Sequence, residues 1–559
     1  MTRLQRKLYT LSFVILFILT APLLIMMASG YSFDWVGKVL VHNGGITIKS
    51  IPREVDIFLD GKKISDKKLN IINGNYLING VRFGKHTVRC EKEGYTSWQK
   101  TVDVHSGVST EFWNVILFPL NNKTLKIYSP TNVERFFLSP RNENELVLYR
   151  KNGDKLSISL LNTKSGQEKL LFETDSYIHF LPQAEENVEW SSNHKKILIP
   201  AEKSTGEKDY LILDTENEEI KPIFFSEIIK KTPLLTKNLS AEEKQKANLK
   251  KSNSAEDALS NGEAKKGKRA GQTFSGKEAV VKDKKAGKAF SPVDLIYYAR
   301  WMFDNDHKLL LLTSDHRLLF VDVDEPTETL LIDEGVNGFD LAGDHLYYLK
   351  LNSGEIWDVK PGKDYRQLIA KTKFPPAIGN EIFLRMFVYD ELRMTFLTPT
   401  KELFVLNKLK PYDWELIFNK IADGVKGIQF SDDGKKMLYW TNNEIWVYML
   451  RDWDNQPRRH RNEKIFITRF LSGVNNVQWL ETFENVIFTK ENLIKAAELD
   501  NRDKINLVDV YQAKGEIEEH NGLYNKQTGL FYFLEDGDSQ KQVRSIEVIK
   551  HSSFFGLGA

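Results

Sequence analysis

Residues 429–440 read QFSDDGKKMLYW, an aromatic-bearing strand pattern followed by a polar turn and an apolar strand pattern. The same succession recurs along most of the chain, and a third apolar stretch that often ends in Asp or Asn follows each copy. Self-similarity at a regular period indicates a repeat architecture. Other copies are residues 136–150 (FFLSPRNENELVLYR), 189–200 (EWSSNHKKILIP), 300–313 (RWMFDNDHKLLLLT) and 478–489 (QWLETFENVIFT).

Eight aromatic residues mark the starts of these units, at spacings of 53, 111, 38, 48, 43, 49 and 45 residues. Subtracting an insertion of about 65 residues from the outlier leaves about 46, which is within the length of a propeller blade. We therefore predict a mainly β protein in which residues 121–550 form a β-propeller, with eight blades favoured and seven as the alternative. The marking aromatics are Phe137, Trp190, Trp301, Phe339, Phe387, Phe430, Trp479 and Tyr524.

The last unit supplies only three strand patterns before the chain ends in a weak tail. Residues 124–128 (TLKIY) precede the first complete unit and have the composition of a strand. We expect this segment to provide the missing outer strand of the last sheet, which would join the two ends of the propeller and remove an open edge.

One copy of the repeat resembles a known family. Phe430-Ser431-Asp432-Asp433-Gly434-Lys435-Lys436 is similar to the Phe-Ser-Pro-Asp-Gly-Lys phrase of PD40 and TolB-like propeller repeats, which are WD40-like in fold. The other copies keep the rhythm and differ in their residues. The resemblance therefore implies a fold and carries no function.

Residues 44–120 show shorter strands separated by turns. Val55, Ile57 and Leu59 alternate with polar residues before Asp60-Gly61, a dipeptide that favours a tight hairpin. A later strand alternates through Val88 and Cys90. We expect Cys90, the single cysteine, to be a buried core residue and not a reactive thiol.

The order of landmarks in this region resembles the PEGA domain, a small β-sandwich of exported bacterial proteins. The matching residues are Ser50 and Pro52, Asp60-Gly61, the run from Gly84 to Val88, and Gly94-Tyr95. The name-giving stretch departs from the family, because it reads Pro52-Arg53-Glu54-Val55 without Gly-Ala. The resemblance implies a β-sandwich that acts as a non-catalytic spacer or attachment module.

Residues 8–28 form an uncharged apolar run of 21 residues behind Arg3, Arg6 and Lys7. A helix of this length matches the roughly 30 Å hydrocarbon core of a bilayer. The positive-inside bias then predicts a cytoplasmic tail of residues 1–7, a lipid-contacting anchor over residues 8–29, and export of the remainder. A cleaved secretory signal is the alternative, because small residues follow the run.

Residues 226–290 interrupt the repeat. Between residues 231 and 290 there are 15 Lys and Arg against 7 Asp and Glu, whereas the whole chain is balanced at 78 and 76. Such a composition cannot bury a core, so we predict a disordered basic insertion. It is either a solvated loop or an arm for anionic wall polymer or lipid headgroups. The candidate contacts of such an arm are Lys265, Lys266, Lys268 and Arg269.

The sequence lacks the common local motifs of catalysis and metal binding, so we expect no catalytic residue, cofactor or metal site. The densest set of reactive side chains lies in residues 313–317, where Asp315, His316 and Arg317 are candidate ligand contacts. Neighbouring residues on a strand point to opposite sides, so Asp315 and His316 are poorly placed to act as a base and its orienting group.

These observations favour a non-enzymatic binding or scaffolding protein, anchored in a bacterial cell membrane with the bulk of the chain outside the cytoplasm. Its expected partners are the bilayer, through residues 8–29, and envelope polymers or other envelope proteins. No nucleic acid is expected, because the overall charge is balanced. The alternative is a propeller-based hydrolase or lyase that acts on envelope glycan or peptide.

Overall fold

The structure is a computed structural model of the 559-residue chain. It describes residues 3–28, 31–34, 39–65, 68–70, 74–120, 127–128, 132–153, 155–180, 188–203, 208–217, 221–233, 296–350, 353–371, 383–412, 418–536 and 541–549. The four basic candidates Lys265, Lys266, Lys268 and Arg269 lie outside these residues. The chain folds into two units, and each is described by itself below.

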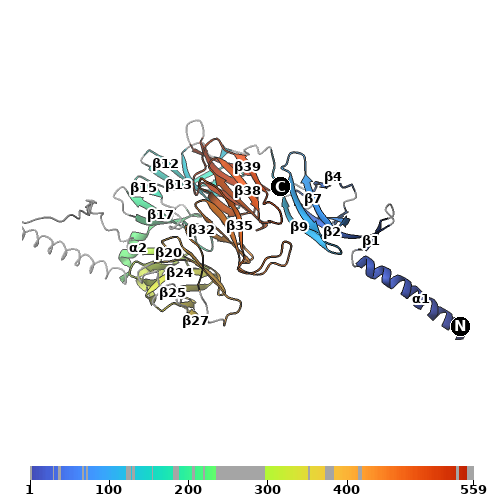
Figure 1. The fold of residues 1–559 in the computed structure, drawn as a ribbon. Helices are drawn as coiled ribbons and strands as arrows, with labels where there is room; N and C mark the ends of the chain where they lie inside the picture. The colour runs from blue at the N-terminus through green and yellow to red at the C-terminus, as the bar shows by residue number, and fades with distance from the viewer. Residues whose placement is uncertain are drawn as a thin grey trace, which may run out of the picture. The chain divides into compact units, whose positions relative to one another are not determined.

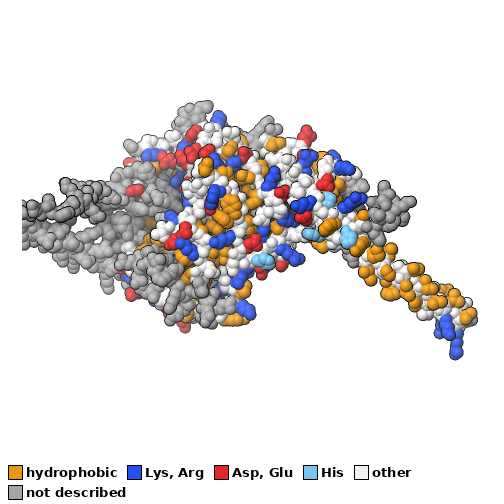
Figure 2. Space-filling model, viewed as in Figure 1, with side chains coloured by type: hydrophobic (Ala, Val, Ile, Leu, Met, Phe, Trp, Pro, Cys, Tyr) orange, Lys and Arg blue, Asp and Glu red, His pale blue; other side chains and the backbone are white. Residues whose placement is uncertain are grey.

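The chain begins with helix α1 (Arg3–Ala28), which contains the whole predicted apolar run. Its segment Arg3–Met26 has a mean hydropathy of 2.4, and none of the segment is buried against the protein. Figure 2 shows apolar side chains along the visible face of α1 and basic side chains at its N-terminal end. By length and composition, α1 can cross a membrane once.

Strands β1 to β9 form an N-terminal module of two sheets (Figure 1). One sheet has the order β1-β2-β6-β5, with β9 parallel to β2, and the other has the order β4-β3-β7-β8. The first sheet also includes β1, which lies N-terminal to the residues predicted to form the module. Its strands are β1 (Tyr31–Asp34), β2 (Val39–Ile51), β3 (Asp56–Leu59), β4 (Lys62–Lys63), β5 (Lys68–Asn70), β6 (Asn75–Arg82), β7 (Gly84–Glu91), β8 (Trp98–Val104) and β9 (Ser109–Ile116).

The predicted local features of this module are confirmed. Asp60 and Gly61 both have positive φ, at 50° and 79°, and they connect β3 to β4 with Leu59 opposite Lys62. A two-residue hairpin with positive φ at both positions matches the twist of the flanking strands. Cys90 is fully buried and shares the core of the module with Ile57.

From residue 127 onward the described residues contain eight sheets. Seven are four-stranded, and in the second sheet β15 and β16 both pair with β17. Each of the eight marking aromatics lies on the first strand or strand pair of its sheet. The first four sheets are β11 (Val133–Leu138), β12 (Glu145–Asn152), β13 (Lys155–Asn162) and β14 (Glu168–Thr174); β15 (Tyr177–Phe180), β16 (Glu189–Trp190), β17 (Lys196–Lys203), β18 (Lys208–Asp214) and β19 (Ile223–Phe224); β20 (Ile296–Trp301), β21 (Lys308–Thr313), β22 (Arg317–Asp322) and β23 (Leu330–Glu334); and β24 (Val336–Ala342), β25 (His345–Lys350), β26 (Glu355–Val359) and β27 (Arg366–Lys371).

The next three sheets continue the pattern, and the eighth takes its fourth strand from the start of the region. The fold class is therefore mainly β with the blade architecture of a β-propeller, and ring closure with eight blades stays a prediction. These strands are β28 (Arg385–Asp390), β29 (Arg393–Leu397), β30 (Leu403–Asn407) and β31 (Asn419–Ala422); β32 (Val425–Phe430), β33 (Lys436–Thr441), β34 (Glu444–Met449) and β35 (Lys464–Arg469); β36 (Asn475–Trp479), β37 (Asn485–Lys490), β38 (Leu493–Glu498) and β39 (Leu507–Gln512); and β40 (Gly522–Asn525), β41 (Leu530–Asp536), β42 (Lys541–Glu547) and β10 (Ile127–Tyr128).

The first unit contains α1, the N-terminal module, most of β11–β12 and the sheets from β32 onward. Its neighbouring sheets pack face to face through buried apolar clusters. The polar residue that precedes the marking aromatic adds a hydrogen bond between neighbouring sheets. Gln429 accepts from the backbone N–H of Trp479 at 3.0 Å, and Gln478 accepts from that of Tyr524 at 3.0 Å. The repeat thus encodes both the apolar contact and a hydrogen bond to the next sheet.

The closing strand of the last sheet also lies in the first unit. β10 pairs antiparallel with β42, with Ile127 opposite Arg544 and Tyr128 opposite Val543. Val133 and Phe136 of β11 pack against Tyr532 and Val543 of the last sheet. The expectation that a segment before the first full unit supplies the outer strand of the last sheet is confirmed.

The second unit contains the sheets from β15 to β31. Its sheets also pack face to face, and Glu189 accepts from the backbone N–H of Trp301 at 3.2 Å in the way that Gln429 does in the first unit. Asp333 accepts from Lys350 at 2.9 Å and from the hydroxyl of Tyr348 at 2.7 Å. Burial would raise the pKa of Asp333, but the hydrogen bonds from Lys350 and Tyr348 hold it below its ordinary value.

Helix α2 (Phe225–Lys231) corrects the boundary of the predicted insertion. The sequence predicts disorder over residues 226–290, yet residues 226–231 are helical. Phe225 and Ile229 are fully buried in a cluster with Trp301 and Leu311. The average composition of the whole stretch did not reveal the three apolar residues that this helix buries, which are Phe225, Ile228 and Ile229. The remainder of the insertion, from residue 234, lies outside the described residues.

Candidate functional site

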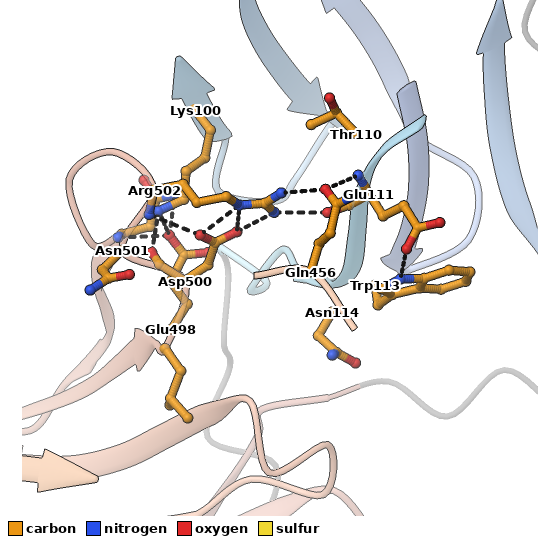
Figure 3. Close-up of polar contacts among 12 residues, drawn as sticks. Lys100, Thr110, Glu111, Trp113, Asn114, Gln456, Glu498, Asp500, Asn501 and Arg502 are labelled. Carbon is orange, nitrogen blue, oxygen red and sulfur yellow. Dashed lines mark hydrogen bonds and ion pairs between the residues drawn. The ribbon is translucent and has the colours of Figure 1, made fainter. Parts of the chain in front are cut away.

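A concentration of polar contacts in the first unit lies where the N-terminal module meets two loops of the propeller sheets (Figure 3). The module contributes strands β8 and β9. The loops connect β34 to β35 and β38 to β39, the third and fourth strands of their sheets. We call this contact the junction.

Lys100 of β8 is the centre of the junction. Its side chain is 0% exposed and forms an ion pair of 2.7 Å with Glu498, whose side chain is 7% exposed. The ammonium group also donates to the backbone carbonyls of Asp500 and Lys504, the latter at 2.8 Å. Glu498 in turn accepts from the indole N–H of Trp98 at 2.8 Å. A buried charge pair is tolerated when its donors and acceptors are satisfied in this way.

Arg502 and Gln456 fasten the neighbouring strand β9 by its backbone. Arg502 donates to the carbonyl of Glu111 at 2.8 Å, and its guanidinium lies 4.5 Å from the centre of the Phe112 ring. Gln456 accepts from the N–H of Glu111 at 3.0 Å and donates to the carbonyl of Ser109 at 2.8 Å. Figure 3 shows Arg502 between Asp500 and this strand. The side chains of Arg502 and Gln456 thus bind backbone groups of β9 in the way that the backbone of a neighbouring strand would.

The junction also has an apolar part. Ile116 and Phe118, at the end of the module, are buried in one cluster with Leu480 and Ile487 of the sheet β36–β39. The side chain of Asn485 donates to the carbonyl of Asn114 at 3.3 Å beside them. Burial of apolar surface and directional polar contacts therefore act at the same contact.

A cavity of about 30 Å³ lies within the junction. Trp98, Trp113, Glu484, Glu498 and Asp500 are among its lining residues. A volume of this size has room for a water molecule. The buried ion pair and the shared apolar cluster make the junction suited to joining two parts of the chain.

Burial and charge act differently on the acidic groups of the junction. Burial raises the pKa of Glu498 in spite of Lys100, and burial likewise raises the pKa of Glu484 beside its partner Lys436. For Asp500, burial also favours the neutral form, but the hydrogen bonds from Arg502 outweigh it and the pKa lies below its ordinary value. Burial thus sets the direction of the pKa shift for Glu498 and Glu484, and the contact with Arg502 sets it for Asp500.

Residues 43–115 match the PEGA domain family model. This segment contains most of the N-terminal module, including both strands of the junction. The chain has no match among curated proteins. The resemblance stated from the sequence is thereby confirmed, and we refer to the N-terminal module as the PEGA domain.

Solved structures that align with the chain include two β-propellers. The C-terminal WD40 domain of Sif2 aligns with a TM-score of 0.42 and 9% identity, over 77% of this chain and 99% of that one. The β-propeller domain of Myceliophteria thermophila Cps50 (Swd1) aligns with a TM-score of 0.36 and 10% identity, over 76% and 99% of the respective chains.

The structure places Asp315, His316 and Arg317 in the hairpin between β21 and β22. Asp315 accepts from Arg317 at 2.9 Å and from the hydroxyl of Thr313, whereas the ring of His316 bonds the carbonyl of Val336 at 3.1 Å. His316 also stacks on Phe383, with ring centres 4.2 Å apart. Burial would raise the pKa of Asp315, but its bonds with Thr313 and Arg317 lower it. Each of these contacts stabilises the turn.

Among the described residues, no group of three or more His, Cys, Asp or Glu is placed to hold a metal ion. The sequence motifs do not single out the junction residues, although one signal is available. β8 alternates Trp98, Lys100, Val102 and Val104 on its buried face, so Lys100 is a charge in an apolar row. Such a residue requires a buried partner.

Proposed function

We propose that the protein is a single-pass membrane protein of the bacterial cell envelope, in which the PEGA domain is a fixed mount for a propeller that binds or scaffolds other envelope components without catalysis. The bulk of the chain lies outside the cytoplasm. Helix α1, with basic residues at its N-terminal end, supports this orientation.

The observation that carries the proposal is the junction. A flexible spacer would leave the two parts joined by a short linker, and domains joined in this way move freely by default. Here the buried pair of Lys100 and Glu498 fixes a single geometry, because a charge without its partner would be buried at high cost. The face of the PEGA domain formed by β8 and β9 is used to hold the chain's own propeller sheets, which supports a mounting role.

A fusion experiment tests the orientation. A reporter enzyme that is active only outside the cytoplasm, placed after Ala559, should be active, and a reporter that is active only in the cytoplasm should not. Cytoplasmic activity would contradict the proposal. N-terminal sequencing of the mature protein should begin at or near Met1, whereas a start near Tyr31 would indicate a cleaved signal.

A sedimentation experiment tests the binding role. The full chain in detergent is mixed with isolated cell-wall sacculi, and both the pelleted protein and the released soluble fragments are measured. Binding without release is expected. Release of sugar or peptide fragments would instead support the hydrolase or lyase alternative.

A charge-neutralised variant defines the part played by the basic insertion. Replacing Lys265, Lys266, Lys268 and Arg269 by Gln should weaken sedimentation with sacculi at low salt, where the Debye length is long, and leave the melting temperature unchanged. Equal binding by the two proteins would favour the solvated-loop interpretation and direct attention to the propeller sheets.

A further inference from the structure

Two exposed apolar side chains lie at one end of the PEGA domain. Phe83, between β6 and β7, is 63% exposed, and Val108, between β8 and β9, is 53% exposed. We call these two residues the apolar tip. Lys85, the second residue of β7, is also exposed, with Asp103 opposite it in the sheet.

The apolar tip is held by backbone hydrogen bonds to β2. The N–H of Phe83 donates to the carbonyl of His42 at 3.0 Å, and the N–H of Gly45 donates to the carbonyl of Val108 at 3.1 Å. Gly44 lies directly below the second loop, where a Cβ atom would come within 2.3 Å of the carbonyl oxygen of His105. Both loops are therefore positioned at the same end of β2.

The same end of β2 is connected to α1 by a very short stretch of chain. α1 ends at Ala28 and β1 begins at Tyr31, so this segment spans at most roughly 10 Å. Tyr31 pairs with His42, and the two rings are in contact with centres 3.9 Å apart. Phe83 is thus about two strand spacings, or roughly 10 Å, from Tyr31.

We propose that the apolar tip inserts into the interfacial layer of the bilayer that α1 spans, beside the outer end of α1. The inference rests on the proposed anchoring by α1. If α1 fills the hydrocarbon core, Tyr31 lies at the headgroup level, where Tyr and Trp are enriched, and Phe83 and Val108 are then carried to the same layer. The PEGA domain accordingly rests on the membrane surface and does not extend away from it.

Spin-label accessibility tests this placement. The full chain is reconstituted in phosphatidylcholine nanodiscs with a nitroxide at Phe83→Cys, and collisions with oxygen and with a water-soluble nickel complex are compared. The matched control is Glu93→Cys, an exposed site beyond the far end of β7 and roughly 25 Å away along the strand. The protein without an added cysteine is the background control, because any label that it takes up must be attached to Cys90, which is buried.

The Phe83→Cys label should show several-fold higher oxygen-to-nickel collision ratios than the Glu93→Cys label, and Val108→Cys should agree with Phe83→Cys. Neutral lipid should suffice, because the contact is apolar. Equal, water-like ratios in discs that contain the protein would overturn this inference and leave the anchor intact. Shielding of the label from both reagents would indicate a protein partner or a second copy and would also overturn it. Failure of the chain to enter the discs would overturn the anchor, and with it this placement.

Discussion

Replacing Lys100 by Met should be among the most damaging single changes in the first unit. The substitution keeps most of the apolar stem, but leaves Glu498 buried and the carbonyls of Asp500 and Lys504 without their donor. Removing one member of a buried ion pair costs about 3–5 kcal/mol. At about 2 °C per kcal/mol for a unit of this size, the melting temperature should fall by roughly 6–10 °C.

The assay compares thermal melts and hydrogen exchange of the full chain with those of a matched control. Lys63→Met also breaks an ion pair, with Asp56, but both side chains are about half exposed, at 58% and 48%. The expected loss there is about 0–1 kcal/mol. Exchange in the Lys100→Met variant should increase at β8 and in the loop between β38 and β39, and should be unchanged in both regions for Lys63→Met.

A second substitution checks the cause. In the Lys100→Met protein, Glu498→Gln removes the uncompensated charge, so the double variant should be more stable than the single variant at pH 7. The instability of the single variant should also shrink as the pH falls, since a folded-state pKa raised above the unfolded value favours proton uptake by the native state. If the Lys100→Met and Lys63→Met proteins have the same melting temperature, the junction does not depend on the ion pair of Lys100 with Glu498, and the expectation is refuted.

Three further predictions concern the sheets. Deleting residues 235–286 should leave the melting temperature nearly unchanged, whereas Phe225→Ala in α2 should cost about 3–5 kcal/mol; equal effects in thermal melts would refute the corrected boundary. Deleting residues 121–128, which removes β10, should expose the edge of β42 and lower the melting temperature by several degrees in the same assay, and an unchanged melt would contradict the closing role. Asp333 has a lowered pKa in the folded state, so it stabilises the fold above about pH 4 and loses this contribution as the pH falls further. The difference in melting temperature between the native protein and Asp333→Asn should therefore shrink below that pH, and a constant difference would contradict the assignment.

The strands of this protein were predictable because their signals are local. Alternating burial, the Asp60-Gly61 turn and the periodic aromatics each depend on residues within a few positions of one another. The closing strand was predictable by counting, since one sheet lacked a member. Helix α2 was missed because the three buried apolar residues among its seven were averaged into the Lys-rich stretch that follows it.

The junction could not be predicted in the same way. Lys100 and Glu498 are about 400 positions apart, and no periodicity relates them. Lys100 alone indicated that some acidic partner must exist, because it shares the buried face of β8 with Trp98. Which of the 76 acidic residues it contacts depends on how the sheets and the PEGA domain meet, and that is a tertiary property.

The pairing of β10 with β42 has a consequence for biogenesis. These strands are joined by more than four hundred residues of chain, so the last sheet cannot be completed until nearly the whole polypeptide has been synthesised. Closing so long a loop is slow relative to local hairpin formation. Because β10 is made first, it stays without a partner until β42 has been synthesised, and chains truncated before β42 never pair it, which exposes them to aggregation and to proteases. A chaperone that protects β10 until β42 is present would therefore be expected to increase yield more than one that acts on the PEGA domain.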